Sequence, residues 1–354
     1  MKNYCLPGDI AEIATRLGHD ADLLAGKSIL MTGGGGFLGR YFINLFAHLN
    51  ATRLKEPCRL TVLDNLITTP DADPWRAWFR SVENDHIRFI QHDVMLPFQE
   101  EGRVDYIIHA AGIASPFYYR AYPLETLEVS VMGTRNMLET AHRHRARMVF
   151  FSSSEIYGDP DPRYVPTPES YRGNVACQGP RACYDESKRV GETLCYIFHN
   201  YHGVHANIIR PFNVYGPGMQ KTDYRILPNF AACLQEGKPL SVYNTGNQTR
   251  TFCYITDAMT GFTLTLLKGV PGATYNIGAP GPEVSVLDLV AIMQKNLNRE
   301  IPYKIIEYPN TYPGDEPNRR CPDIRNAEIQ LGYRSQVGLE DGLRRFFGWT
   351  AENF

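Results

Sequence analysis

The segment Met31-Thr32-Gly33-Gly34-Gly35-Gly36-Phe37-Leu38-Gly39-Arg40 determines the fold that the sequence predicts. An apolar run over residues 28–31 precedes it, and apolar residues recur with helical spacing from Tyr41 to Leu49. The order is therefore strand, glycine-rich turn and helix. The free amides and the dipole at the start of that helix favour an anion in the turn. We predict that the pyrophosphate of a dinucleotide binds there.

Three glycines of this segment have separate predicted roles. Gly33 permits the tight turn, Gly36 lets the backbone approach a phosphate, and Gly39 lets the helix press on the strand. Phe37 and Leu38 lie between the last two glycines and belong to the same predicted site. Glycines also occur in ordinary loops, but the flanking strand and helix favour cofactor binding.

A second predicted strand, over residues 59–63, ends at Asp64. A carboxylate at this position can accept hydrogen bonds from both ribose hydroxyls of NAD, and it would repel the 2′-phosphate of NADP. Asp64 could also cap a turn before Asn65, and the two roles are compatible. The predicted cofactor is NAD.

Further strands are predicted over 86–90, 104–109, 148–152 and 207–210, and they alternate with helices. This alternation predicts an α/β protein with a doubly wound, mostly parallel sheet. Asp93, after the third strand, could accept a hydrogen bond from the adenine amino group. Small residues after the fourth strand would let a ribose lie against the backbone. The predicted cofactor residues at these two strand ends are Asp93, Val94, Ala110 and Ala111.

Three regions are predicted along the chain. Residues 1–26 form a helical extension, and residues 27–215 form mainly the cofactor-binding domain. Residues 216–354 form mainly a smaller lobe over the carboxyl edge of the sheet, where α/β proteins bind ligands, with some chain crossing between the two.

The composition excludes several classes of protein. The 354 residues are 43% hydrophobic with a net charge of −2, which provides no general field for nucleic acid or an anionic membrane. The eight cysteines lack metal-ligand spacing, so we expect reduced thiols and no metal site. No apolar run reaches the length of a membrane span, and no signal-peptide pattern is found. We expect a cytoplasmic protein.

A second motif carries the predicted chemistry. Tyr184 and Lys188 are four residues apart at the start of a predicted helix over 184–201, so they share one helix face. A nearby ammonium stabilises phenolate, lowers the pKa of the tyrosine and makes it a usable base. In isolation such a pair is more often an ordinary surface pair. The serine cluster Ser152-Ser153-Ser154, at a strand end that follows a dinucleotide half-fold, favours catalysis.

Together these features resemble the extended short-chain dehydrogenase/reductase family, also described as NAD-dependent epimerases and dehydratases. The motifs are T-G-x-x-G-F-x-G at 32–39, the serine before Tyr157-Gly158, Tyr184-x-x-x-Lys188, and R-P-F-N-V-Y-G-P at 210–217. Within that family, three longer stretches look most like UDP-glucuronate decarboxylases (UDP-xylose synthases). They are S-S-S-E-I-Y-G-D-P at 152–160, G-P-R-A-C-Y-D-E-S-K-R-x-G-E-T at 179–193, and R-C-P-D-I-R at 320–325.

The resemblance implies a Rossmann-type sheet with a smaller mixed α/β substrate-binding lobe, and an oxidation at C4 of a nucleotide sugar. Tyr184 would remove the proton of the C4 hydroxyl while NAD takes the hydride, and Ser153 would hydrogen-bond the same oxygen. The resulting ketone is β to the C5 carboxylate of a glucuronate, so CO₂ can leave with its electrons stored in an enolate. Protonation at C5 and return of the hydride give UDP-xylose and regenerate NAD; a related 4-keto or pentose product is the other outcome that the resemblance allows.

Two further residues match decarboxylase positions beside C5. The resemblance implies that Arg320 delivers a proton or stabilises the enolate, and that Glu155 orients the carboxylate or a water. In 4,6-dehydratases an aspartic acid precedes this glutamate, whereas Ser154 is a poor acid for expelling hydroxide. A dehydratase and a 4-epimerase are therefore the alternatives, and a non-catalytic NAD-binding regulator is a more remote one.

The smaller lobe is expected to bind the nucleotide and its phosphates. Arg250, within Gln248-x-Arg250-x-Phe252, matches a family arginine that contacts the diphosphate, a task that suits a guanidinium. The full set of predicted substrate residues is Ser154, Asn213, Arg225, Asn229, Tyr243, Arg250 and Arg320.

Two departures from the family and one expectation of assembly complete the analysis. Ser130 stands where the family usually has an asparagine that supports the tyrosine–lysine proton relay, and the extension over 1–26 is additional. Family members usually form dimers through two helices that correspond to residues 124–145 and 184–201. We therefore expect a homodimer.

Overall fold

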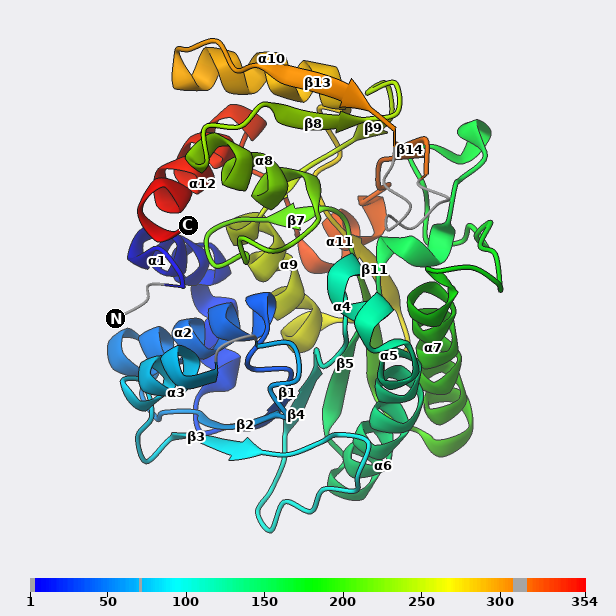
Figure 1. Ribbon diagram of the computed structural model, residues 1–354. Coiled ribbons are helices and arrows are strands. Elements are labelled where there is room, and N and C mark those ends of the chain that lie inside the picture. Colours follow the sequence, from blue (N-terminus) through cyan, green and yellow to red (C-terminus); the bar gives the residue numbers. More distant parts are fainter. Residues whose placement is uncertain (1–3, 70–71, 308–316) are drawn as a thin grey trace.

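A seven-stranded, entirely parallel sheet forms the centre of the computed structural model, which describes residues 4–69, 72–307 and 317–354 (Figure 1). The strand order is β11-β6-β5-β4-β1-β2-β3. The strands are β1 (Ser28–Thr32), β2 (Arg59–Asp64), β3 (Ile87–Gln91), β4 (Tyr106–His109), β5 (Arg147–Phe151), β6 (Ala206–Pro211) and β11 (Thr274–Ile277). The order reverses direction between β1 and β4, so the predicted doubly wound fold is confirmed. In such sheets, ligands bind at the carboxyl ends of the strands beside this reversal.

Helices cover both faces of the sheet. Successive strand residues point to opposite sides, and apolar side chains on each side must be buried. In β5, Val149 and Phe151 pack into one hydrophobic core, and Met148 and Phe150 pack into the other. The helices over the first face are α2 (Phe37–Thr52), α3 (Ala72–Arg80) and α9 (Ile255–Lys268). The second face is covered by a layer of three helices, with α6 (Thr134–His144) and α7 (Ala182–His202) on the sheet and α5 (Pro123–Glu128) packed against α7.

The helix predicted over 124–145 is interrupted. A π-helical turn over Val129–Gly133 separates α5 from α6, and α4 (Pro116–Ala121) precedes them. The π turn contains Ser130, which is 1% exposed. Single π turns within helices are frequent at functional sites.

The smaller lobe consists of short strand pairs and helices above the sheet (Figure 1). β13 pairs with β8, β12 and β14 both pair with β9, and β10 pairs with β7. These strands are β7 (Val214–Tyr215), β8 (Leu240–Tyr243), β9 (Thr249–Arg250), β10 (Cys253–Tyr254), β12 (Val284–Ser285), β13 (Tyr303–Ile306) and β14 (Arg319–Arg320). The helices are α8 (Ile226–Gln235), α10 (Val286–Leu297), α11 (Arg325–Leu331) and α12 (Leu339–Asn353). β11 crosses back into the large sheet, although its residues lie beyond the predicted boundary at 216. That boundary stays a prediction.

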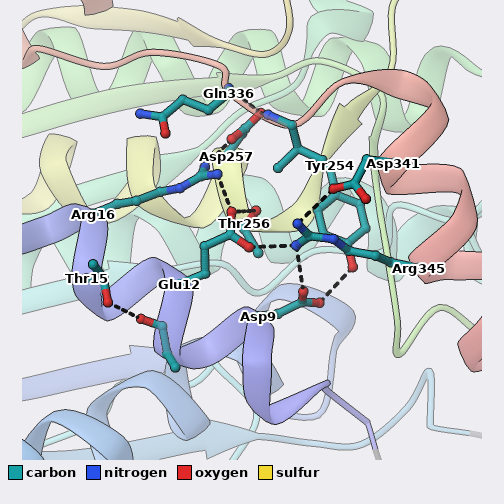
Figure 2. A network of polar contacts seen from close by, with 12 residues as sticks. Asp9, Glu12, Thr15, Arg16, Tyr254, Thr256, Asp257, Gln336, Asp341 and Arg345 are labelled. Carbon is teal, nitrogen blue, oxygen red and sulfur yellow. Dashed lines mark hydrogen bonds and ion pairs between the residues drawn. The ribbon is translucent and has the colours of Figure 1, made fainter.

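The N-terminal extension contains α1 (Pro7–Leu17) and a 3₁₀ segment over Gly18–Leu24. α1 packs against α2 and α9, and Figure 2 shows its acidic and basic side chains meeting α9 and α12. Asp9 accepts a 2.8 Å hydrogen bond from Tyr254, and Glu12 pairs with Arg345 at 2.6 Å. Arg16 forms an ion pair with Asp257. Among the helices of the described residues, none is long and apolar enough to cross a membrane.

Candidate active site

The glycine-rich turn joins β1 to α2 at the reversal of strand order. Gly33 has φ +81°, and a Cβ there would lie 2.7 Å from the backbone of Ala110 after β4. A Cβ on Gly39 would overlap the carbonyl oxygen of Gly33. Gly36 is the N-cap residue of α2. Only bare backbone fits this cradle, which matches the requirements of a pyrophosphate at a helix N-terminus.

Asp64 at the end of β2 holds this turn in place. Its carboxylate accepts hydrogen bonds from the Gly35 amide at 2.8 Å and the Leu66 amide at 2.6 Å. Burial raises its pKa, and the two amide hydrogen bonds oppose that effect. The turn-capping role is therefore observed, whereas contact with the cofactor ribose stays a prediction.

The other predicted cofactor residues follow the same edge of the sheet. Asn65 donates a 3.2 Å hydrogen bond to Asp93, and the Val94 carbonyl accepts one at 2.9 Å from Asn136 on α6. The Ala111 amide donates to Thr32 at 3.2 Å. The residues on this edge that do not line the neighbouring cleft are Gly33, Gly36, Gly39, Asp64, Asn65, Asp93, Val94 and Ala111.

A cleft between this edge and the smaller lobe brings the remaining predicted residues together. Its lining includes every residue predicted for catalysis, namely Ser153, Glu155, Tyr184, Lys188 and Arg320. It also includes the cofactor residues Phe37, Leu38 and Ala110, and the substrate residues Ser154, Asn213, Arg225, Asn229, Tyr243 and Arg250. Residues from β5, α7 and the smaller lobe therefore converge on one space.

The environment of Tyr184 differs from the sequence prediction. Burial raises its pKa to about 12, and a hydrogen bond with Ser153 is the largest opposing effect. The Lys188 ammonium lies 5.7 Å from the centre of the Tyr184 ring and donates a 2.9 Å hydrogen bond to the Phe151 carbonyl. Burial lowers the pKa of Lys188 to about 8. The predicted lowering of the Tyr184 pKa is thus wrong for the protein without ligands, because desolvation of the phenol dominates.

Glu155 is held in the cleft by two arginines. Arg320 donates to its Oε2 at 2.7 Å, and Arg181 forms an ion pair with the same oxygen. Arg181 also lies 3.4 Å from Asp185, which is 6% exposed. Burial, reinforced by the negative charge of Glu155, raises the pKa of Asp185.

Arg181 and Asp185 were not predicted as site residues. Both lie within the motif at 179–193, and their spacing of four residues was a signal that the sequence contained. The sequence alone could not show that Glu155 lies next to that motif in the folded protein.

The arginines of the smaller lobe have their guanidinium groups fixed by neighbouring oxygens. Arg225, the N-cap residue of α8, pairs with Asp223 at 2.5 Å. Arg250 donates to the Thr249 carbonyl at 2.8 Å. Asn213 adopts φ +43° and donates to the Thr251 carbonyl at 2.8 Å. Orientation of this kind prepares donors for an anionic ligand.

Sequence comparison agrees with this geometry. The model of the NAD-dependent epimerase/dehydratase family matches residues 29–278. The chain belongs to this family. It is therefore an NAD-dependent enzyme, and the glycine cradle described above fits its cofactor.

Several curated members of the family resemble the chain over most of its length. UDP-glucuronic acid decarboxylase 5 of Arabidopsis thaliana is 39% identical over 89% of this chain and 86% of that protein. UDP-glucuronic acid decarboxylase 1 of Xenopus tropicalis is 36% identical over 90% of this chain and 71% of that protein. The predicted resemblance to these decarboxylases is confirmed.

Solved structures of the family share the fold. DesIV, a dTDP-glucose 4,6-dehydratase from Streptomyces venezuelae with NAD bound, superposes with a TM-score of 0.77 at 28% identity, covering 92% of this chain and 97% of that one. UDP-glucuronic acid 4-epimerase from Bacillus cereus, in complex with UDP-glucuronic acid and NAD, gives a TM-score of 0.75 at 23% identity, covering 92% of this chain and 100% of that one. The second likeness supports the fold alone.

Proposed function

We propose that this family member decarboxylates UDP-glucuronate to UDP-xylose. The observation that carries the proposal is the position of Glu155 and Arg320, which are paired at 2.7 Å in the cleft that Ser153 and Tyr184 also line. The similarity to UDP-glucuronic acid decarboxylases supports it. Ser154, next to Glu155, lacks the acidity that expulsion of a hydroxide needs.

In this proposal, Tyr184 accepts the proton of the C4 hydroxyl, and Ser153 hydrogen-bonds the same oxygen. The glycine-rich turn between β1 and α2 would hold NAD, which would supply a reversible acceptor for the C4 hydride. Lys188 supplies a positive charge that stabilises the phenolate of Tyr184. Because the C4 ketone is β to the carboxylate, the electrons of the C5–carboxylate bond pass into an enolate as CO₂ leaves.

Arg320 stabilises the enolate or delivers the proton to C5, and Glu155 orients the substrate carboxylate or a water. The smaller lobe holds the rest of the substrate. Arg250 contacts the diphosphate, for which a guanidinium is suited. Asn213 faces the phosphates, and Arg225, Asn229 and Tyr243 contact the nucleotide.

Product analysis tests this function. The protein is incubated with NAD and, in separate reactions, with UDP-glucuronate or the neutral hexose UDP-glucose, and the product mass is measured. Loss of CO₂ from the sugar is the expected result. An unchanged mass with inverted C4 would instead indicate a 4-epimerase, and loss of water from a neutral nucleotide hexose would indicate a 4,6-dehydratase. Either of these results without decarboxylation would overturn the proposal.

We further propose a homodimer that forms through the layer of α5, α6 and α7. Apolar side chains exposed on this layer, or on the π turn between α5 and α6, support it, among them Leu124, Leu127, Met132 and Val190. Exposed apolar groups gathered on one surface are typical of an interface. A cytoplasmic location is the accompanying proposal, and the presence of eight free cysteines supports a reducing compartment.

A further inference from the structure

Asn276, on β11, is fully buried, and its side-chain amide contacts three separate segments of the chain. Its Oδ1 accepts a 2.8 Å hydrogen bond from the hydroxyl of Tyr157, in the 3₁₀ turn after β5. Its Nδ2 donates to the carbonyl oxygens of Thr167 and Asp323, at 2.9 and 3.0 Å. Leaving any of these buried groups unpaired would be costly. The amide therefore fixes the three segments relative to one another.

The hydrogen-bond partners determine which way this amide points. Arg210 donates to the hydroxyl of Tyr157 at 2.6 Å, so the one proton of that hydroxyl is left for Asn276. Burial raises the pKa of Tyr157, so this proton is retained at neutral pH. The two carbonyl oxygens on the other side of Asn276 need donors, which its NH₂ group supplies. A carboxylate has the same shape but could replace only the accepting half of the amide.

The segment that Asn276 holds through Asp323 also carries Arg320. Thr167 forms backbone hydrogen bonds with this segment, to the Cys321 carbonyl at 2.8 Å and from the Asp323 amide at 3.0 Å. The guanidinium of Arg320 donates to Glu155 at 2.7 Å, whereas its buried Nε has no hydrogen-bond partner among the described residues. With one donor unpaired, this guanidinium depends on the backbone of residues 320–323 for its position.

Two links thus join the turn after β5 to residues 320–323. The first crosses the cleft, from Glu155 to Arg320. The second runs from Tyr157 through Asn276 to Asp323. In the proposed function, the sugar binds beside Glu155 and Arg320 and competes for the groups of the first link. Neither Tyr157 nor Asn276 lines the cleft, so the bound sugar leaves the second link intact.

The turn after β5 has further anchors. The Asn174 amide donates to the Tyr157 carbonyl at 2.9 Å, and Arg189 donates to the Ile156 carbonyl at 3.2 Å. Arg320, in contrast, belongs to β14, which pairs with β9 of the smaller lobe. Loss of the Asn276 amide should therefore displace Arg320 more than it displaces the turn.

We propose that Asn276 is a positioning residue that, together with Tyr157, holds Arg320 in place while the sugar occupies the cleft. The inference rests on the proposed function and deepens it, because it assigns Asn276 to the loss of CO₂ and not to the oxidation of C4. Asn276 acts through Arg320 without touching the substrate. Misplacement of a reacting group by about 1 Å can cost about 100-fold in rate.

Asn276→Asp tests this role, since the carboxylate still accepts from Tyr157 but presents an oxygen to the two carbonyls. After rapid mixing with UDP-glucuronate, the absorbance of the reduced nicotinamide reports oxidation of C4, and CO₂ release reports decarboxylation. CO₂ release should slow at least about tenfold more than oxidation does. Asn207→Asp is the matched control. Asn207 is equally buried and donates to two carbonyls, but it lies near the amino end of β6, away from the cleft.

A double-mutant cycle shows whether Asn276 acts through Arg320. Once Arg320→Met has removed the guanidinium, adding Asn276→Asp should change CO₂ release by less than about twofold, because nothing is left to position. If Asn276→Asp does not fold, Tyr157→Phe gives the same test, since it removes the hydroxyl and keeps the ring. Its control is Tyr275→Phe, which removes another buried hydroxyl, one that donates to Gln330.

The inference is overturned if Asn276→Asp slows oxidation and CO₂ release equally, or if its effect on CO₂ release multiplies with that of Arg320→Met. An unmodified protein that releases no CO₂ would refute the proposed function, and the inference with it. Normal CO₂ release by the unmodified protein, with equal slowing of both steps in Asn276→Asp, would refute the inference alone.

Discussion

The phenol of Tyr184 is subject to opposing influences. It is buried beside Tyr119 of α4, whose ring stacks on it at 5.6 Å, and this burial raises its pKa to about 12. Ser153 opposes the effect with a hydrogen bond. Lys188 is buried as well, and the lowered pKa of its ammonium, about 8, brings loss of its charge close to neutral pH. Below that pH the lysine is charged and can favour the phenolate, and above it this support is lost.

Replacing the phenol tests its role directly. Tyr184→Phe should lower kcat for decarboxylation by about 10²- to 10⁴-fold, the usual contribution of a positioned acid–base group. NAD affinity, measured by fluorescence titration, should stay within about twofold because the ring and its packing remain. Tyr164→Phe is the control, since Tyr164 is half exposed. Unchanged activity in Tyr184→Phe would rule out this mechanism. If the unmodified protein binds NAD but turns over no substrate, the alternative of an NAD-binding regulator holds instead.

Spacing in the sequence was sufficient to place Tyr184 and Lys188 on one helix face, but it could not indicate how far water is excluded from them. The exclusion depends on Tyr119, 65 positions earlier in the chain. Arg181 and Asp185 were overlooked for a related reason. Their contact with Glu155 arises only when the end of β5 and the start of α7 are brought together by the sheet.

At the level of elements, α1 is held to the rest of the protein by ion pairs and hydrogen bonds as well as by its packing against α2 and α9 (Figure 2). Asp257 on α9 has a fully buried side chain that pairs with Arg16. The same carboxylate accepts hydrogen bonds from Ser335 at 2.8 Å and from the amides of Gln336 and Val337 at 2.9 and 3.0 Å. The extension, α9 and the segment before α12 thus meet at one carboxylate.

Removing the cation from this carboxylate should be costly. Arg16→Met should reduce the free energy of unfolding by about 3 kcal/mol, because a buried carboxylate loses its counter-charge. Arg53→Met should reduce it by less than about 1 kcal/mol, because the pair of Arg53 with Asp22 is exposed. Urea denaturation followed by circular dichroism measures both. Equal effects of the two changes would show that α1 contributes little through this ion pair.

The regular elements were predictable where the apolar pattern is local. β1, β2 and β5 lie within one residue of their predicted limits, since alternating or continuous apolar runs specify buried strands. The π turn over Val129–Gly133 was not predicted, because no local signal distinguishes it from an α-helix. The partners of α1 were equally inaccessible, since Arg16 and Asp257 are separated by 241 positions.

For the whole molecule, the layer of α5, α6 and α7 is the surface that we propose as the dimer interface. Leu124→Glu combined with Met132→Glu should convert the proposed dimer to a monomer, because two charges would be buried in each half of the interface. Sedimentation velocity measures the change. Ile329→Glu, on α11, is the control, as Ile329 is 83% exposed and lies outside this layer. A monomer for the unmodified protein would contradict the proposed assembly.

The return of the chain into the large sheet as β11 constrains how this architecture can be altered. β11 pairs with β6 along Thr274–Ile277, after the chain has already built β7, β8, β9 and β10 outside that sheet. A fragment that stopped near residue 215 would leave β6 as an unpaired, hydrophobic edge strand, and such edges are prone to self-association. A chimera that exchanges the C-terminal segment between relatives to change sugar specificity would therefore have to include β11 in the exchanged segment.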